Sequence, residues 1–327
     1  MADTTNEHAL LLPEGRTIAY STAGDASSTD VVIFFHGVFG VGAAPALLPL
    51  ALVERKVHYV APTLPGWGNT SPTASDVPFH EQLYKDTSAL IQHLHPHAED
   101  LRLYISGGSF GSVAAQILYG ATYEKFPLGR RIQGMLLLAP FTPCRVHKEY
   151  ASCLSWQSWF AIGPPSRIVP GNLIMRIASS FMKRKLDTPE HAEEFMRAFV
   201  FKNMTDPERE LYEKWKVEKG IKDGEEVKQL ADGVYRSVQR SWEGFKAVPD
   251  IFHSDWGGYS PAALGDENSK PVVLFLTKED KETKKMGEWL ASNLKNSKVR
   301  YGEGGHIGSL FVMDDIWADF MSQFLCN

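Results

Sequence analysis

Ser109 is the residue whose surroundings most clearly indicate chemistry. It is the centre of Gly107-Gly108-Ser109-Phe110-Gly111, which follows the apolar run 101–106 and precedes the helical pattern of residues 112–119. A serine presented on a tight turn between a strand and a helix needs very small residues two positions to either side, because the two elements approach closely there. The amides that begin the helix favour negative charge beside the serine. The pattern therefore predicts a serine nucleophile for acyl transfer.

A serine hydroxyl becomes a good nucleophile only when a neighbouring base accepts its proton and an acid orients that base. His306 is the predicted base, because it lies in a glycine-rich stretch that follows the strand-like run 298–301. Asp280 is the predicted acid, since it follows the run 272–276 and can leave the carboxyl end of that strand toward His306. Other acids remain open at this stage: Glu279, Asp250 and Asp255.

A second loop is a candidate source of hydrogen-bond donors for the reaction. The strand-like run 31–35 leads into His36-Gly37-Val38-Phe39-Gly40. We predict that the backbone amides of Val38 and Phe110 form an oxyanion hole for a tetrahedral intermediate. Taken alone, His36 is equally well explained as a structural histidine before a turn.

The elements around these residues predict an α/β domain with a mostly parallel central sheet flanked by helices. Short apolar runs rich in β-branched or aromatic residues alternate with helical patterns, as in buried parallel strands. Two earlier runs, 9–12 and 17–20, predict an N-terminal hairpin, and residues 310–325 predict a terminal helix that covers the sheet. The apolar runs are 31–35, 58–61, 101–106, 135–139 and 272–276.

Residues 141–270 differ in character from the rest and predict a helical cap inserted after the sixth strand. They are charged and interrupted by proline and glycine, with apolar residues at helical spacing in 188–203, 207–217 and 225–245. The core domain then consists of residues 1–140 and 271–327. The cap is rich in aromatic side chains, which favours an apolar guest, although any single ring is well explained by packing. These rings are Trp156, Trp159, Phe160, Phe195, Phe199, Trp215, Trp242, Phe245 and Trp256.

Composition excludes several classes of function. The 327 residues are 43% hydrophobic and carry 34 basic and 39 acidic side chains, a formal net charge of −5, so nucleic acid is not an expected partner. No apolar run reaches the roughly 18 to 20 residues of a membrane span. Residues 1–8 lack the pattern of a signal peptide, so we expect a cytoplasmic protein.

Neither a cofactor nor a metal ion is expected. Cys144, Cys153 and Cys326 are odd in number and lack metal-ligand spacing, which favours ordinary thiols in a reducing compartment. His93, His95 and His97 resemble a metal cluster, but Pro96 interrupts any helical register, so we interpret them as a solvated helix end. A small-molecule substrate is the expected partner, and the sequence leaves the oligomeric state open.

Together these motifs resemble the α/β-hydrolase fold family, in its serine-hydrolase branch with a helical cap. The resemblance also rests on Thr63-Leu64-Pro65-Gly66-Trp67-Gly68, where many members have aspartate in place of Thr63. The order serine, acid, histidine along the chain is the one that this fold uses. Members that are epoxide hydrolases or haloalkane dehalogenases use an aspartate nucleophile, so both activities are disfavoured here.

The resemblance implies an esterase-like or lipase-like serine hydrolase that forms an acyl-enzyme. The elbow around Ser109 is also similar to that of proline iminopeptidases, although those enzymes have H-G-G-P-G where this chain has His36 to Gly40. An acyltransferase with the same three residues is a further alternative. A receptor or scaffold on this fold is the alternative from a different class, disfavoured because all three positions are intact.

Overall fold

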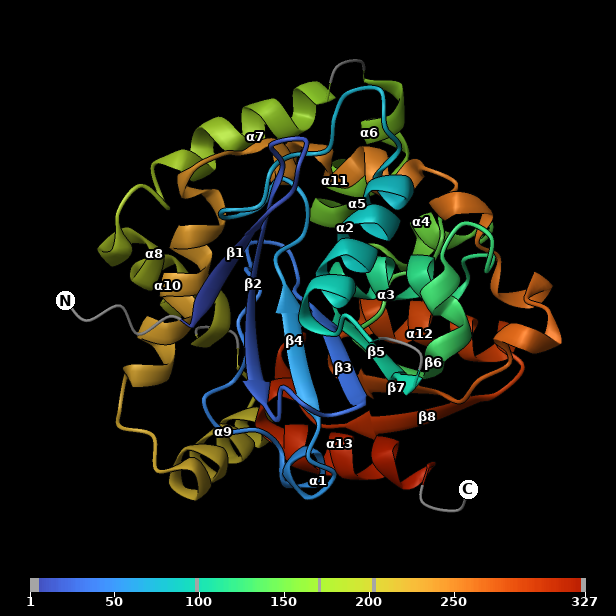
Figure 1. The fold of residues 1–327 in the computed structure, drawn as a ribbon. Helices are drawn as coiled ribbons and strands as arrows, with labels where there is room; N and C mark the ends of the chain where they lie inside the picture. Colours follow the sequence, from blue (N-terminus) through green and yellow to red (C-terminus); the bar gives the residue numbers. More distant parts are fainter. Residues whose placement is uncertain (1–5, 98–99, 170–171, 202–203, 325–327) are drawn as a thin grey trace.

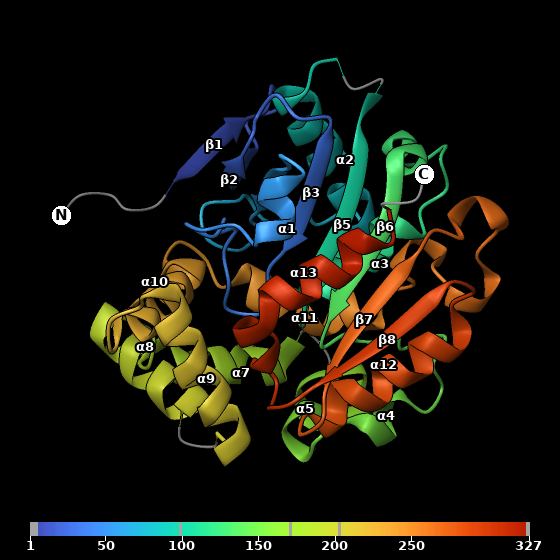
Figure 2. The same cartoon turned by 90° about the horizontal axis from the view of Figure 1, so that it is seen from below.

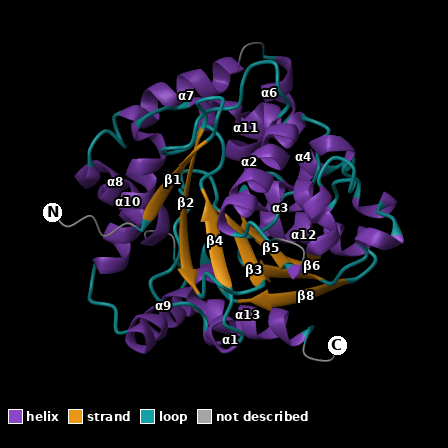
Figure 3. Cartoon of the chain, in the orientation of Figure 1, coloured by secondary structure: helices purple, strands orange, loops and turns teal. Residues whose placement is uncertain are grey.

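The computed structural model describes residues 6–97, 100–169, 172–201 and 204–324, and its centre is an eight-stranded sheet (Figures 1 and 3). The strand order is β1-β2-β4-β3-β5-β6-β7-β8. The β1–β2 and β2–β4 pairs are antiparallel and the other neighbours are parallel. The strands are β1 (Glu7–Leu11), β2 (Thr17–Gly24), β3 (Asp30–Phe35), β4 (His58–Pro62), β5 (Arg102–Gly108), β6 (Ile132–Leu138), β7 (Val272–Thr277) and β8 (Ser297–Gly302).

The sheet forms where the sequence predicts it, because its central strands are apolar on both faces. In β3, Val31 and Ile33 belong to the core on one face of the sheet, whereas Val32 belongs to the core on the other. Strands buried on both faces read as continuous apolar runs. The expected hairpin is present as β1 and β2, and β6 begins three residues earlier than its predicted run.

Helices cover both faces of the sheet. The core on one face includes residues of α2 (Phe79–Leu94), α3 (Gly111–Tyr119) and α12 (Lys281–Asn293). The core on the other includes residues of α1 (Leu50–Glu54) and α13 (Met313–Ser322), and Figure 2 shows α13 crossing the strands. The predicted terminal helix is therefore present, preceded by the 3-10 turn η8 (Gly308–Val312), and Leu325 lies outside the described residues.

The chain between β6 and β7 is helical, in agreement with the pattern of residues 188–245. These helices are α4 (Tyr150–Cys153), α5 (Trp156–Ile162), α6 (Pro164–Ile168), α7 (Leu173–Lys183), α8 (Pro189–Met196), the π-helix η4 (Arg197–Phe201), α9 (Asp206–Lys219), α10 (Glu225–Gln239) and α11 (Glu243–His253). The run 225–245 contains a helix break, since α10 ends before Arg240 and α11 begins at Glu243. We propose that residues 141–270 form the cap and that the two flanking segments form the core domain.

Local sequence explains where these helices begin and end. Thr188 and Thr205 accept hydrogen bonds at the starts of α8 and α9, and each is followed closely by a proline, which is favoured in a first helical turn. Gly220 ends α9 with a φ of 63°, a left-handed conformation that glycine adopts at low cost. None of the described helices is long and apolar enough to span a membrane.

The loop Thr63 to Gly68 joins the core to the helices of the insertion. The Gly68 amide donates to the Ser237 carbonyl of α10 at 2.8 Å, and the Gly244 amide of α11 donates to the Gly66 carbonyl at 3.0 Å. Gly66 has a φ of 82°, and a Cβ there would lie 2.7 Å from the Gly244 nitrogen. This contact requires glycine, so the backbone of the loop packs directly against α10 and α11.

The turns that follow α11 return to the core. η5 (Trp256–Gly258) lies against α2 and α3, and Trp256 is fully buried. η6 (Pro261–Ala263) and η7 (Asp266–Asn268) then lead into β7. The last part of the proposed cap segment therefore packs beside the sheet rather than above its carboxyl edge.

Two glycine substitutions test the packing argument, because they should change the free energy of unfolding in opposite directions. A Cβ on Gly111 would lie 2.1 Å from the Phe35 carbonyl oxygen, so Gly111→Ala should lower the free energy of unfolding by about 2 kcal/mol or more. Gly233 lies inside α10, and a Cβ added there would meet nothing within 4 Å outside the backbone of its own helix. Gly233→Ala should raise that free energy by roughly 0.5 to 1 kcal/mol. Urea denaturation of both variants measures the two changes.

Candidate active site

Ser109 lies on the turn between β5 and α3, as its motif predicts. Its φ is 51°, a left-handed conformation that costs a non-glycine residue about 1 kcal/mol or more. The Ser109 amide donates to the Leu138 carbonyl of β6 at 2.9 Å, which holds the strained residue against the neighbouring strand. The turn therefore presents the serine side chain beyond the carboxyl ends of the parallel strands.

Two glycines of the motif make this turn possible. A Cβ on Gly107 would lie 2.2 Å from the Gly111 carbonyl oxygen, and a Cβ on Gly111 would overlap the Phe35 carbonyl of β3. Gly108, by contrast, has room for a Cβ, whose nearest neighbour would be 3.8 Å away. The close approach of strand and helix therefore explains the outer glycines of the motif and leaves Gly108 unconstrained.

The structure brings the three predicted catalytic residues together. His306 Nε2 lies 2.9 Å from Ser109 Oγ, and His306 Nδ1 lies 2.6 Å from Asp280 Oδ2. These distances fit a chain in which Nδ1–H donates to the carboxylate and Nε2 accepts from the serine hydroxyl. Residues separated by up to 197 positions thus form one hydrogen-bonded chain.

Asp280 occupies a position built to hold a carboxylate. It is the N-cap of α12, where its side chain accepts from the Thr283 amide at 3.2 Å and from Thr283 Oγ1 at 2.5 Å. The helix N-terminus favours negative charge there. Asp280 is 9% exposed, whereas the neighbouring Glu279 is exposed to solvent.

The other two acids lie elsewhere. Asp250 accepts a hydrogen bond from Asn172 on the insertion, and Asp255 accepts from Gly257 at the start of η5. Neither forms a hydrogen bond with His306, so the geometry favours Asp280 among the four acids that the sequence left open.

The electrostatics of the pair suit a base that works near neutral pH. Burial by itself would lower the pKa of His306, but the hydrogen bond to Asp280 and its charge outweigh burial and raise it above 6.5. Burial of Asp280 opposes its ionisation, yet the hydrogen bonds from His306 and Thr283 hold its pKa below 3.8. Asp280 is therefore ionised at neutral pH and stabilises a protonated His306.

The predicted oxyanion loop lies beside the serine. A Cβ on Gly37 would be 3.3 Å from Ser109 Cβ and 3.8 Å from Ser109 Oγ. The amides of Val38 and Phe110 donate to no acceptor in the described part of the chain. Both are therefore available as donors.

His36 fixes this loop rather than taking part in proton transfer. Its Nε2 accepts from the Leu64 amide at 2.9 Å, and its Nδ1 donates to the Gly37 carbonyl at 2.8 Å. Burial lowers its pKa to about 4, so the ring is neutral at neutral pH and can accept from Leu64. The sequence left the role of His36 open, and the structure shows a bridge between the two loops.

Phe39 connects the oxyanion loop to the helices above it. Its ring stacks on Phe245 of α11 at a centroid separation of 4.9 Å and meets Trp67, Phe195 and Trp242 edge-on at 6.0 to 6.3 Å. Phe39 has a φ of 59°, which turns the chain immediately after Val38. Phe195, Trp242 and Phe245, three of the aromatic residues noted in the sequence, therefore surround Phe39. Phe39 directly follows Val38, a candidate oxyanion donor.

Glu208 is a residue of the site that the sequence did not reveal. It lies on α9, is only 5% exposed, and its Oε1 accepts from the Gly305 amide at 2.9 Å. Gly304 has a φ of 95° and would place a Cβ 3.1 Å from the Glu208 carboxyl group. A carboxylate of the insertion thus holds the backbone next to His306. No local pattern distinguishes this glutamate from the other acids of α9.

Outside the triad, the described residues offer little further chemistry. They contain no group of three histidine, cysteine or acidic side chains placed to hold a metal ion. His93 and His97 are exposed, but the interpretation as a solvated helix end is wrong for His95, which is buried and hydrogen-bonded to His58 at 2.8 Å. Cys144 and Cys153 are free thiols, and Cys326 lies outside the described residues.

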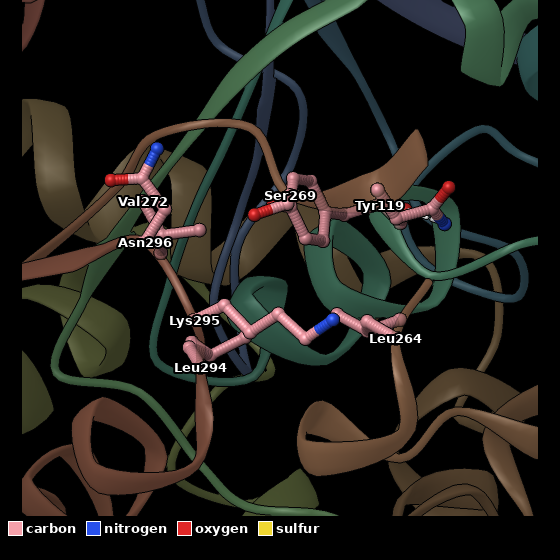
Figure 4. Close-up of a pocket in the computed structure, with 8 residues that line it drawn as sticks. Tyr119, Leu264, Ser269, Val272, Leu294, Lys295 and Asn296 are labelled. Carbon is pink, nitrogen blue, oxygen red and sulfur yellow. Dashed lines mark hydrogen bonds between the residues drawn. The ribbon is translucent and has the colours of Figure 1, made fainter. Parts of the chain in front are cut away.

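The crevice drawn in Figure 4 is separate from this site. It is lined by Tyr119 at the end of α3, by Val272 at the start of β7 and by Asn296 before β8. The triad lies at the opposite ends of these strands, since Asp280 follows the end of β7. In parallel α/β sheets ligands bind at the carboxyl ends, so this crevice is not part of the candidate site.

Comparison with known proteins identifies the family. A family model described as "Serine aminopeptidase, S33" matches residues 26–197, which is more than half of the 327 residues. The chain belongs to this family. The S33 match covers the oxyanion loop and the elbow, whereas Asp280 and His306 lie beyond it. A comparison with curated proteins gave no match.

Solved structures with the same fold cover almost the whole chain. A hydrolase from Pseudomonas aeruginosa PA01 is 14% identical, with 99% of this chain and 100% of that chain covered and a TM-score of 0.60. An esterase from Exiguobacterium antarcticum is 14% identical, with 96% and 98% covered and a TM-score of 0.57. MenH from S. aureus is 14% identical, with 93% and 96% covered and a TM-score of 0.53.

These likenesses confirm the α/β-hydrolase fold that the sequence motifs implied. At such low identity they show the fold alone. The S33 family match supports a hydrolase activity for this chain.

The contact between Glu208 and the histidine loop predicts a graded effect of substitution. Glu208→Ala removes the acceptor for the Gly305 amide, so we expect kcat for hydrolysis to fall about 10-fold or more with a smaller change in KM. Glu208→Gln keeps an oxygen acceptor and should retain most of the activity. Equal activity of wild type and Glu208→Ala in steady-state assays would remove any role for this contact.

The raised pKa of His306 predicts the pH dependence of the reaction. An imidazolium cannot accept the Ser109 proton, so kcat/KM should rise with pH through a midpoint above 6.5. In Asp280→Asn the hydrogen bond and charge of Asp280, the main causes that raise the pKa of His306, are gone while burial remains, so the midpoint should move to lower pH. Histidine NMR, with His306 assigned from a His306→Gln variant, measures both midpoints. A midpoint that stays unchanged in Asp280→Asn would contradict the coupling.

Proposed function

We propose that this S33 family member is a serine hydrolase that cleaves an ester, or a related acyl bond, of a small and largely apolar substrate. The observation that carries the proposal is the hydrogen-bonded chain from Ser109 Oγ through His306 to Asp280, at 2.9 and 2.6 Å. Nucleophile, base and acid then have the relative geometry that acyl transfer requires.

The proposed reaction begins when Ser109 Oγ attacks the substrate carbonyl and His306 Nε2 accepts the hydroxyl proton. The amides of Val38 and Phe110 are the proposed donors to the resulting oxyanion. His306 then gives the proton to the departing alcohol, which leaves an acyl group on Ser109. Water, deprotonated by the same imidazole, attacks this ester, and His306 then returns the proton to Ser109 Oγ as the bond between Oγ and the acyl carbon breaks and the acid leaves. Asp280 keeps Nδ1 protonated and stabilises the imidazolium in both halves.

The surroundings of the oxyanion loop support an apolar acyl group as substrate. Phe39 follows Val38 directly and contacts four aromatic rings, two of them on α11 or just before it. Trp67 and Phe245 are buried, whereas Phe39, Phe195 and Trp242 are partly exposed. These three rings can contribute apolar contact and few hydrogen bonds, which is typical of sites for hydrocarbon groups. The proposal needs no cofactor.

An aminopeptidase is the second candidate, and the family match favours it. The matching model is described as a serine aminopeptidase, and Gly107 to Gly111 is similar to the elbow of proline iminopeptidases. The same three residues would attack a peptide carbonyl by the same steps. Such an enzyme must also bind a free amino terminus, which an ester of a fatty acid does not have, so amino-acid and fatty-acyl substrates distinguish the two.

Hydrolysis of p-nitrophenyl esters tests the proposal directly. The wild-type protein should release p-nitrophenol from acyl chains of increasing length, with an optimum that reports the size of the acyl site. Ser109→Ala should lower kcat by about 10⁴ to 10⁶ without loss of fold, because no other group replaces the nucleophile.

Covalent labelling by a fluorophosphonate separates the remaining outcomes. Labelling of Ser109 with turnover of amino-acid p-nitroanilides but not of fatty-acyl esters would favour the aminopeptidase. Turnover that persists in Ser109→Ala would contradict the assignment of the nucleophile. Absence of both labelling and turnover would favour a non-catalytic role.

A further inference from the structure

One segment of the insertion differs in charge from the rest of the chain. Residues 150–186 contain no acidic side chain and five basic ones, so the other residues carry 29 of the 34 basic side chains against all 39 acidic ones. All five are exposed, and none forms an ion pair with a carboxylate of the described chain. They are Arg167, Arg176, Lys183, Arg184 and Lys185.

The same segment exposes an unusual share of large apolar side chains. Of the fourteen large hydrophobic residues that are exposed among the described residues, seven lie in α5, α6 and α7. Ile168 is 79% exposed, and Phe181 and Trp156 are 72% and 71% exposed. Gathered apolar groups on a protein surface mark an interaction site more often than scattered ones do. The others are Trp159, Phe160, Leu173 and Ile177.

Helix α7 shows how the two kinds of side chain are arranged. Leu173, Ile177 and Phe181 recur every four residues and form one exposed stripe, while Met175 and Ser179 are buried on the opposite face. Figure 1 shows α7 along the outer edge of the molecule, and its contacts are to α5 and α11. A helix that packs by one face normally turns polar residues outward. Here the outward face is apolar and edged by cations.

Charge decides which occupant fits this surface. In a symmetric dimer each copy presents the same surface, so unpaired cations would face unpaired cations. A lipid bilayer with anionic headgroups offers both negative charge for the basic side chains and an apolar layer for the rings beneath it. Aromatic and leucine-like residues on one face with lysine and arginine beside them are typical of helices that lie in such an interface.

We infer that the exposed residues of α5, α6 and α7, here called the basic apolar surface, dock this protein on an anionic lipid bilayer. The cations are attracted to the headgroups, and Ile177, Phe181 and Trp156 enter the boundary between headgroups and acyl chains. This is peripheral binding through exposed side chains and needs no spanning helix. The inference does not depend on the proposed reaction, because it concerns binding alone.

Sedimentation with lipid vesicles tests the inference on the full-length protein. Binding is expected to vesicles of phosphatidylcholine mixed with phosphatidylglycerol, at low salt, and not to vesicles of phosphatidylcholine alone. The double variant Lys183→Gln/Arg184→Gln should weaken the partition coefficient roughly 25-fold, since each cation near an anionic surface contributes roughly fivefold. Ile177→Ser/Phe181→Ser should weaken binding as well, because it removes apolar groups that enter the bilayer.

Matched controls come from another part of the insertion. Val217 on α9 is 81% exposed, and Lys228 on α10 is exposed, and both lie outside the basic apolar surface. Val217→Ser and Lys228→Gln should bind vesicles like the wild type. All substituted side chains are exposed, so thermal unfolding should be nearly unchanged in every variant, which separates loss of binding from loss of fold.

Three results would overturn the inference. Failure of the wild-type protein to sediment with the mixed vesicles excludes the anionic bilayer as occupant. Equal binding by the wild type and the charge variant excludes the role of the cations. A dimer in analytical ultracentrifugation that Ile177→Ser/Phe181→Ser dissociates, without vesicle binding by the wild type, would assign the surface to a second copy of the chain.

Discussion

The close approach of α3 to the carboxyl ends of β3 and β5 is the constraint on which the rest of the site depends. A Cβ on Gly107 or Gly111 would lie 2.2 or 2.1 Å from a backbone oxygen, so the approach exists only with glycine at both positions. It leaves Ser109 in a left-handed conformation, held by the hydrogen bond that its amide donates to the Leu138 carbonyl. The backbone strain at Ser109 is thus stabilised by the neighbouring strand and helix, which are part of the main core.

The loops around the serine are fixed by buried polar contacts rather than by the core. His36 forms hydrogen bonds that join the oxyanion loop to the loop packed against α10 and α11. Asp280 accepts a hydrogen bond from Thr283 in the first turn of α12. Glu208 holds Gly305 from a helix of the insertion. Every one of these groups is buried or half-buried, where a lost partner costs more than at the surface. His306, Asp280 and the proposed oxyanion donors are therefore positioned by several independent elements.

The insertion contributes in two different ways. Toward the core it supplies Glu208, whose contact reaches the backbone beside His306, and the rings that surround Phe39. Away from the core, α7 presents apolar side chains and unpaired cations outward. One segment of the chain thus contacts the candidate site and also carries the surface that we propose docks on an anionic bilayer. A change in how the insertion packs would alter both, because α11 contacts α7 and also the loop that holds Trp67.

The sequence by itself determined the strands, the elbow and the candidate positions Ser109 and His306, because these depend on local patterns. Continuous apolar runs mark strands buried on both faces, and Gly107 to Gly111 carries the steric requirement of the turn in its own residue types.

The break between α10 and α11 and the burial of His95 beside His58 did not follow from local pattern. Only the tertiary structure distinguished Asp280 from Glu279, Asp250 and Asp255, since that depends on which carboxylate faces His306. The same is true of Glu208, whose partner lies 97 positions away. Periodicity reports which side chains are buried, but a contact between distant residues is decided by how whole elements pack.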